Sequence, residues 1–304
     1  MRSSEQAREA LIDQALNSAP RLTREALTLG ELIGGGGSAS VEAVRWGGER
    51  LYLKRPLPRG DEREGAYGVA REALTLSKLQ GCRAPQLKAL LCEGLCEGLC
   101  EGERLLGLVY APLEGWSLRA LRGREPWSPL EIAGLLDQVL LCLQEARARG
   151  VEGHGDLSAR HAIVNARGEL GLIDWERAWG AHVIAEPPSA HADALGFAAL
   201  WLELVTGQRL TSPSAQLQAL QRQGLSVSAL QAQGWPGSWA EALCTSLTLT
   251  GEPLPVSALQ EALWAPTSLL SQGVLYSNTA SLKREAQARL CLRGKSELQR
   301  EPNA

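Results

Sequence analysis

The chain has 304 residues, a formal net charge of -3 and 44% hydrophobic residues. This length favours about two domains, and the hydrophobic content is enough for sizeable cores. The small negative charge argues against a nucleic-acid partner. The sequence contains no run of 18 apolar residues, so we expect no membrane-spanning helix. Seven cysteines without disulfide spacing, and an N-terminus without the apolar core of a signal peptide, favour a cytoplasmic location.

The first segment, residues 5–28, is predicted to form a helix. Ala7, Leu11, Ile12 and Leu16 recur on one stripe of such a helix. We expect an amphipathic helix at this place to pack on the domain that follows.

Four consecutive glycines occupy positions 34–37, between strand-like flanks. Glycine lets a backbone fold closely over phosphate oxygens and donate N–H groups to them, although a flexible hairpin turn is the alternative. Thirteen residues after Val41, the alternating segment 51–54 predicts a strand that ends in Lys54. A lysine in an apolar strand is costly unless its ammonium meets a negative partner, such as a phosphate or a carboxylate.

Glu72 is the expected carboxylate partner of Lys54. It belongs to the helix predicted over residues 62–80 and lies near the apolar face of that helix. Glu64 is a competing candidate on the same helix, and a solvent-exposed Glu72 is the structural alternative.

Residues 91–102 are three tandem copies of Leu-Cys-Glu-Gly. Cys92, Cys96 and Cys100 would line one face of a helix, which suggests a metal site. However, a glycine at every fourth position weakens a helix by roughly 1 kcal/mol each, and no fourth ligand is spaced to complete a zinc site. A duplicated loop between two strands is therefore the favoured interpretation.

A buried strand is predicted over residues 105–109, and the best-defined helix of the chain begins after Ser128. Ser128, Pro129 and Glu131 match a capping box with proline at the first helical position. Apolar residues then keep a helical period to Leu143, so this helix leads into a His-Gly-Asp loop.

The segment from His154 to Asp174 carries the two residues on which the functional interpretation depends. Asp156 lies in a short polar loop, and Asp174 follows an apolar run. The residues between them predict a hairpin, with Asn165 at its turn, that would carry both carboxylates to the same end of two paired strands. One carboxylate could then orient a hydroxyl while the other holds a phosphate-bound metal ion.

In this order, the motifs over roughly residues 29–210 resemble those of the protein-kinase-like phosphotransferases. The glycine-rich pattern of that superfamily is matched with Ala39 in place of its third glycine. The resemblance implies catalytic roles for Asp156, Lys54 and Glu72. The nucleotide-binding residues that it implies are Gly34, Gly36, Val41, Lys54, the gatekeeper Tyr110, and the hinge residues Ala111 and Leu113.

Departures from the usual pattern narrow the resemblance. The His-Gly-Asp loop has glycine where most protein kinases carry arginine. In this respect it resembles the corresponding loop of the aminoglycoside and choline phosphotransferases and of RIO-type kinases. His161, where asparagine is usual, and the run Ile-Asp-Trp-Glu-Arg-Ala at 173–178 resemble the lipopolysaccharide core (Kdo and heptose) kinases. Mg²⁺ prefers oxygen, so Asp174 is the principal implied metal ligand. His161 is the second implied metal residue, a poor direct ligand that could instead hydrogen-bond Asp156 or a metal-bound water.

Residues 193–207 resemble the kinase F-helix pattern D-x-W-S-x-G-x-x-L-x-E-x-L-T-G. The resemblance implies that Asp193 caps this helix and holds the backbone of the catalytic loop. Only eighteen residues lie between Asp174 and Asp193, which leaves little room for an activation loop with a phosphorylation switch. Glu176 stands where the glycine of D-F-G is usual, and this implies a fixed, constitutively competent site.

The implied fold is α+β: a bilobal protein-kinase-like fold with a small β-rich N-lobe that holds one helix, and a larger, mostly helical C-lobe. The expected parts are a helical extension (1–28), the N-lobe (29–110), the hinge and C-lobe (111–272), and a tail (273–304). The tail segment 281–304 has six basic and three acidic residues, so we expect a solvated terminal helix. Peripheral contact with the inner face of an anionic membrane is the alternative.

The implied activity is transfer of the γ-phosphate of ATP to a hydroxyl group, with Mg²⁺ as the metal and Mn²⁺ as the alternative. The expected acceptor is a lipopolysaccharide core sugar or another small hydroxyl compound. A serine or threonine of a protein is the second possibility, and a nucleotide-binding pseudokinase without turnover is the third. The sequence leaves the oligomeric state open.

Overall fold

The structure of the protein is a computed structural model, and the residues that it describes are 4–35, 39–57, 62–93, 104–121, 127–179, 191–206, 226–232, 235–248, 256–265 and 279–298. The chain divides into two compact units. Unit 1 comprises Met1–Leu113, Ala146–His154 and Asp174–Pro187, and unit 2 comprises Glu114–Glu145, Gly155–Ile173 and Pro188–Ala304. Helices and strands both occur, which agrees with the expected mixture of α and β structure. None of the described helices has the length and apolar character needed to span a membrane.

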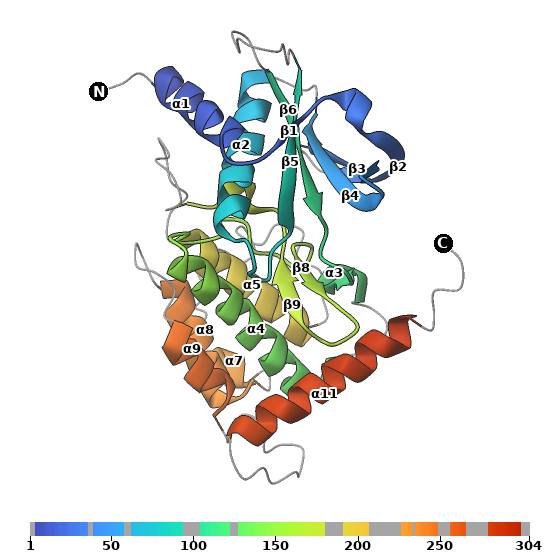
Figure 1. Cartoon of the computed structure of the whole chain (residues 1–304). Helices are drawn as coiled ribbons and strands as arrows, with labels where there is room; N and C mark the ends of the chain where they lie inside the picture. The colour runs from blue at the N-terminus through green and yellow to red at the C-terminus, as the bar shows by residue number, and fades with distance from the viewer. Residues whose placement is uncertain are drawn as a thin grey trace. The chain divides into compact units, whose positions relative to one another are not determined.

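Unit 1 is built on a six-stranded sheet with the strand order β1-β5-β6-β4-β3-β2 (Figure 1). The strands are β1 (Arg21–Leu22), β2 (Thr28–Gly35), β3 (Ala39–Trp46), β4 (Glu49–Pro56), β5 (Gln86–Glu93) and β6 (Arg104–Ala111). Neighbours run antiparallel, except that β1 is parallel to β5. The other elements are α1 (Ser4–Leu16), η1 (Arg24–Ala26), α2 (Glu62–Lys78) and η2 (Trp175–Arg177). The strands predicted at 51–54 and 105–109 are confirmed as parts of β4 and β6.

The helix predicted over residues 5–28 is present only in its first half, and the prediction is wrong for the second half, because α1 ends at Leu16. Polar side chains satisfy its last carbonyl groups: Asn17 donates to the carbonyl of Asp13 (2.9 Å) and Ser18 to that of Ala15 (2.7 Å). Pro20 cannot continue a helix. The next residues instead form β1, which joins the sheet beside β5.

Helix α2 packs against the sheet, as Figure 1 shows, and confirms the helix predicted over residues 62–80. Its apolar face is fully buried at Ala70, Ala73 and Leu76. On the sheet, Gly107 permits a close approach of β6 to β4. A Cβ atom at Gly107 would lie 2.6 Å from the carbonyl oxygen of Lys54, which is too close for any other residue.

Unit 2 contains a small sheet with the strand order β7-β8-β9 and most of the described helices. Its strands are β7 (Trp116–Ser117), β8 (Ala162–Val164) and β9 (Leu170–Leu172). Its helices are α3 (Leu118–Leu121), α4 (Pro129–Ala148, with its C-terminal end counted in unit 1), α5 (His191–Thr206), α7 (Val227–Ala232), α8 (Gly237–Thr248), α9 (Val256–Leu263) and α11 (Thr279–Leu298). The buried Trp201 of α5 packs against Phe197 and Trp239, with ring centroids 5.9 and 5.6 Å apart.

Two predictions of local structure in unit 2 are confirmed. The capping box starts α4, because Ser128 N–H donates to the Glu131 carboxylate (2.9 Å) and Glu131 N–H donates to the Ser128 hydroxyl (3.3 Å). The hairpin is formed by β8 and β9, which pair antiparallel. Asn165 lies at its turn, where the side-chain oxygen accepts N–H groups from Arg167 (2.9 Å) and Glu169 (3.0 Å).

The terminal helix α11 is present, but it is not fully solvated as expected. Leu282, Ala286 and Leu290 are buried on one face of it. The helix also contacts the turn of the hairpin: a Cβ atom at Gly168, whose φ is +72°, would lie 2.7 Å from Cβ of Leu290. The amide of Gln287 donates to the carbonyl of Arg167 at 2.6 Å. One face of α11 therefore belongs to the core of unit 2.

Candidate functional site

The site in unit 1 begins with a row of residues across three strands. Gly34 of β2 pairs with Val41 of β3, and Val41 pairs with Lys54 of β4. Residues paired directly across strands project to the same face of a sheet. The glycine at position 34 is not required by packing, because a Cβ atom there would meet open space. The structure therefore brings three of the predicted nucleotide-binding residues together.

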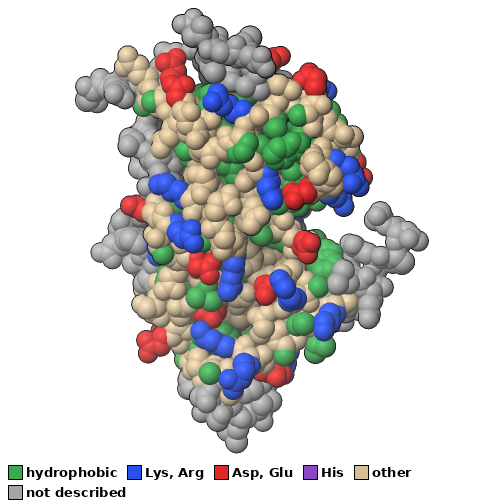
Figure 2. Space-filling view, viewed as in Figure 1, with side chains coloured by type: hydrophobic (Ala, Val, Ile, Leu, Met, Phe, Trp, Pro, Cys, Tyr) green, Lys and Arg blue, Asp and Glu red, His purple; other side chains and the backbone are tan. Residues whose placement is uncertain are grey.

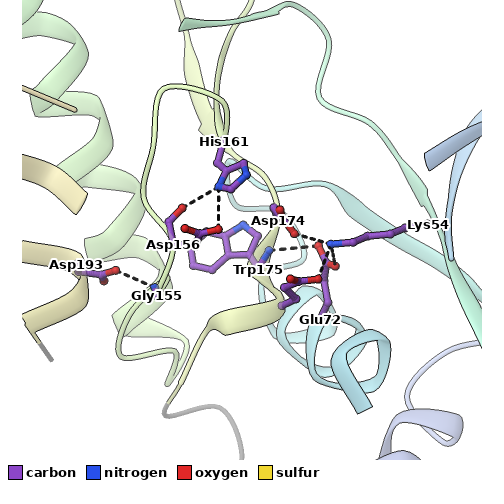
Figure 3. Close-up of polar contacts among 9 residues, drawn as sticks. Lys54, Glu72, Gly155, Asp156, His161, Asp174, Trp175 and Asp193 are labelled. Carbon is purple, nitrogen blue, oxygen red and sulfur yellow. Dashed lines mark hydrogen bonds and ion pairs between the residues drawn. The ribbon is translucent and has the colours of Figure 1, made fainter. Parts of the chain in front are cut away.

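Lys54 is 7% exposed, and its ammonium contacts three carboxylates. The Nζ atom donates to Glu72 Oε2 of α2 at 2.7 Å and to Asp174 Oδ1. Glu176 Oε2 lies 3.1 Å from the same Nζ. Figure 3 shows the lysine side chain extended toward Glu72 and Asp174. The predicted pairing of Lys54 with Glu72 is confirmed, and the alternative of a solvent-exposed Glu72 is wrong.

Lys54, Glu72, Asp174 and Glu176 form a cluster with one positive and three negative groups. The pKa values of Lys54 and Glu72 are shifted as a result of burial and of these charges. Burial opposes the charge on Lys54, but Glu72, Asp174 and Glu176 together raise the pKa of its ammonium well above the ordinary value. Burial raises the pKa of the Glu72 carboxyl to about 7; Lys54 opposes this rise, and the Asp174 charge adds to it. One ammonium among three carboxylates leaves net negative charge in a poorly solvated place.

Asp174 has an uncommon backbone conformation. Its φ and ψ are 67° and 60°, and it is the one non-glycine residue with positive φ in the described part of the chain. This left-handed conformation costs roughly 1–2 kcal/mol for most residues and is more accessible to aspartate and asparagine. The turn lets the next residue, Trp175, donate its N–H to Glu72 Oε1 at 3.2 Å. The buried Trp175 ring packs against His154, with centroids 4.5 Å apart.

The predicted adenine-contacting residues lie at the end of β6. Tyr110 pairs with Tyr52 of β4, and the two rings meet edge to face at 6.0 Å. Burial, followed by the charge of Glu72, raises the pKa of the Tyr110 hydroxyl above its ordinary value. Ala111 is the last residue of β6, and Leu113 is the last residue of the first segment of unit 1. Tyr110 and Ala111 belong to β6, which is the neighbour of the β4 strand that carries Lys54.

In unit 2, the His-Gly-Asp loop is held by a buried polar contact. Asp193, 1% exposed and in the first turn of α5, accepts the N–H of Gly155 at 2.8 Å. The expectation that Asp193 holds the backbone of this loop is confirmed (Figure 3). The expectation that it caps the helix is wrong, because α5 begins earlier, at His191. The adjacent Asp156 keeps a side chain that is 40% exposed. The buried Asp193 therefore fixes the backbone of the loop at Gly155, while the Asp156 carboxylate stays accessible to solvent.

The His161 side chain lies closer to the main chain of Asp156 than to its carboxylate. Its Nδ1 lies 2.7 Å from the carbonyl oxygen of Asp156 and 3.6 Å from the carboxylate of the same residue. A carbonyl oxygen only accepts, so this contact assigns the proton to Nδ1. The His161 carbonyl also accepts the N–H of Ile173 (2.9 Å), which extends the hairpin. The expected contact between His161 and Asp156 is present.

The three carboxylates of unit 1 could hold a metal ion. One oxygen from each of Glu72, Asp174 and Glu176 lies within 4.8 Å of the others. Carboxylate oxygens suit Mg²⁺, so the donor set fits the predicted metal. The side chain of Asp174 is 28% exposed, against 22% for Glu176 and 4% for Glu72, so Asp174 is the most open of the three.

Some predicted residues lie outside the described parts of the chain. These are Gly36 of the glycine-rich segment, Gly207 of the F-helix pattern, Cys96 and Cys100 of the repeat, and the side chain of Glu64. Cys92 is described and is buried in β5.

Glu176 is the site residue whose role the sequence did not reveal. It was expected only as a replacement for glycine, whereas it contacts Lys54. The short turn η2 after Asp174 returns the side chain at 176 to the same cluster. The close packing of η2 on α2 could not be deduced from spacing alone.

The surface carries mixed charge: on the face in Figure 2, acidic and basic side chains are interspersed among the residues that the structure describes.

The chain was compared with known proteins, and neither a protein-family model nor a curated protein matches it. Because no family model or curated protein matches, the chemistry of the site residues is the basis for the function.

Proposed function

We propose that this chain is an ATP-dependent phosphotransferase with a bilobal protein-kinase-like fold, in which unit 1 is the N-lobe and unit 2 the C-lobe. One observation carries the proposal: the buried Lys54 ammonium is shared by Glu72 of α2 and by Asp174. A buried ammonium oriented by a helix carboxylate suits the binding of nucleotide phosphates, which are the strongest anions such a site meets.

Lys54 would hold the α- and β-phosphates of ATP, with Glu72 as its positioning partner. The row of Gly34, Val41 and Lys54 gives the phosphates a glycine backbone and a cation on one face of the sheet. Tyr110, Ala111 and Leu113 would border the adenine. Phosphoryl transfer needs little covalent chemistry from the protein, so positioning and charge neutralisation are its main contributions.

Asp174 would hold Mg²⁺, or Mn²⁺ in its place, and the bound metal supplies neutralisation of phosphate charge. Asp156 would accept the hydrogen bond of the acceptor hydroxyl and take its proton. Its 40% exposure leaves room for a substrate hydroxyl. His161 would keep the loop in shape through the carbonyl of Asp156 rather than through a direct metal contact, since nitrogen is a poor Mg²⁺ ligand.

The acceptor that we propose is a lipopolysaccharide core sugar or a similar small hydroxyl compound, phosphorylated in the cytoplasm or at the inner face of the membrane. A protein serine or threonine is the alternative acceptor. A specific observation favours a second function, a nucleotide-binding pseudokinase: an imidazole replaces the second oxygen ligand at position 161, and its Nδ1 contacts main chain.

The test is incubation of the purified protein with Mg²⁺ or Mn²⁺ and γ-labelled ATP, with and without core oligosaccharide. Label on the sugar, reduced by about 100-fold or more in Asp156→Ala, is the expected result. Asp156→Ala should still bind ATP, whereas Lys54→Met should not. Label on protein favours the alternative acceptor, and nucleotide binding without turnover favours the pseudokinase. If neither ATP nor ADP binds, the proposal is wrong.

A further inference from the structure

Glu176 contacts the lysine that the proposed function assigns to nucleotide phosphates. Its Oε2 atom lies 3.1 Å from Lys54 Nζ, on the turn that directly follows Asp174. A phosphate that binds Lys54 must share the ammonium with Glu176 or displace it. Two anions that compete for one buried cation repel each other strongly, because the surroundings screen charge poorly.

The other two carboxylates are less suited to displacement. Glu72 is 4% exposed in its side chain and is fixed by the N–H of Trp175 as well as by Lys54. Asp174 is the N-cap residue of η2, and its backbone is held in the left-handed conformation. Glu176 has a partly exposed side chain and the longest of the three contacts with Nζ. It is the carboxylate that can leave Lys54 at least cost.

A second cation lies on α2, the helix that contacts the turn carrying Glu176. Arg71 precedes Glu72 on α2, and its guanidinium lies 5.5 Å from the ring centroid of Tyr67. The buried Nε atom of Arg71 has no hydrogen-bond partner among the described residues. Arg71 therefore has an unused donor on the helix that η2 contacts.

We propose that Glu176 is a displaceable carboxylate, which pairs with Lys54 in the nucleotide-free protein and moves to Arg71 when a nucleoside di- or triphosphate binds Lys54. This inference rests on the proposed nucleotide binding. Each of the two anions then has its own cation, and the arrangement has two states that the nucleotide biases through its contact with Lys54. Binding of the phosphate is thereby coupled to the position of the turn that carries Asp174.

The test is calorimetric titration with ADP in EDTA, so that no metal ion adds its own attraction. Glu176→Gln removes the competitor and should tighten ADP binding by about three- to tenfold. Arg71→Gln removes the second position of Glu176 and should weaken ADP binding by a similar factor. In the double variant the Arg71 substitution should have no effect, because the carboxylate that needs Arg71 is absent. Arg71→Lys should keep most of the wild-type affinity.

The control is Glu49→Gln, which makes the same charge change. Glu49 lies 3.5 Å from Lys88 on the same sheet, and its side chain is 62% exposed. ADP affinity should not change in this variant. Thermal unfolding of each variant confirms that it is folded before titration.

The outcomes separate this inference from the proposed function. If wild type binds ADP and Glu176→Gln does not tighten binding, the displacement is wrong while nucleotide binding stands. Equal effects of Arg71→Gln with and without Glu176 also overturn it, because they show simple electrostatics without exchange of partners. If no protein in the series binds ADP, both proposals are wrong.

Discussion

The carboxyl of Glu72 makes stability depend on pH in a direction opposite to that of most acidic residues. Burial raises its pKa from an ordinary 4.5 to about 7 in the folded protein. The folded state therefore binds a proton more tightly than the unfolded chain. The stability that this provides is fully present below pH 4.5 and is lost as the pH rises through 7. A shift of this size corresponds to about 3 kcal/mol, and the side chain is buried, so solvent screening is small.

Glu72→Gln isolates this contribution, since glutamine keeps the shape and does not titrate. We expect the free energy of unfolding of the wild type, relative to Glu72→Gln, to fall by about 3 kcal/mol between pH 4.5 and pH 7.5. Urea denaturation at several pH values, followed by tryptophan fluorescence, measures this difference. Groups that titrate equally in both proteins cancel.

Two other described groups with shifted pKa values, Glu131 and Lys54, titrate outside this pH window. Hydrogen bonds from Arg293 and Ser128 outweigh the effect of burial and lower the pKa of Glu131, so its contribution is lost only as the pH falls below 4.5. The raised pKa of Lys54 acts above pH 10. A difference between wild type and Glu72→Gln that stays constant from pH 4.5 to 7.5 would refute the raised pKa of Glu72.

Two further predictions concern the attachment of α11 in unit 2. Arg293→Ala should destabilise the protein by about 2 kcal/mol in urea denaturation, because Arg293 contacts the largely buried Glu131 carboxylate at 2.9 Å and the Trp127 ring at 4.0 Å; a loss below about 0.5 kcal/mol would contradict this. Gly168→Ala should cost about 3 kcal/mol, because its φ is +72° and its Cβ would overlap α11, whereas Gly47→Ala, with φ +59° and open space, should cost about 1 kcal/mol. Equal costs at the two glycines would show that α11 does not press on the hairpin turn.

The sequence could predict those parts of the structure that depend on local patterns. The capping box at Ser128 and the turn at Asn165 follow from side chains that bond to nearby backbone, and both are present. The pair of Lys54 and Glu72 was predictable because a lysine in an apolar strand demands a partner and α2 supplies one nearby. Asp174 was predictable as the polar end of an apolar strand.

What the sequence could not predict depends on contacts between distant segments. The parallel pairing of Arg21 with Leu90 joins residues far apart in the chain, and no periodicity marks β1. The early end of α1 at Leu16 was missed because apolar residues continue beyond it, while Asn17 and Ser18 satisfy the last carbonyls. The contact of Glu176 with Lys54 required the backbone turn at 174 and the packing of η2 on α2, neither of which leaves a local pattern.

The features around Lys54 are hard to explain by folding alone. A protein selected only for stability would pair one buried ammonium with one carboxylate, or replace both by apolar side chains, which is often neutral or stabilising. Here Glu72 has a raised pKa, Asp174 is in a left-handed conformation, and Arg71 has a buried donor without a hydrogen-bond partner among the described residues. Each feature costs free energy, and the three residues belong to α2 and to the start of η2, two elements that pack together. Unfavourable features that gather at one place are typical of functional sites, where a ligand provides the compensating interaction. A divalent metal ion bound at Asp174 would relieve the imbalance, because it would give the carboxylates a second cation beside Lys54.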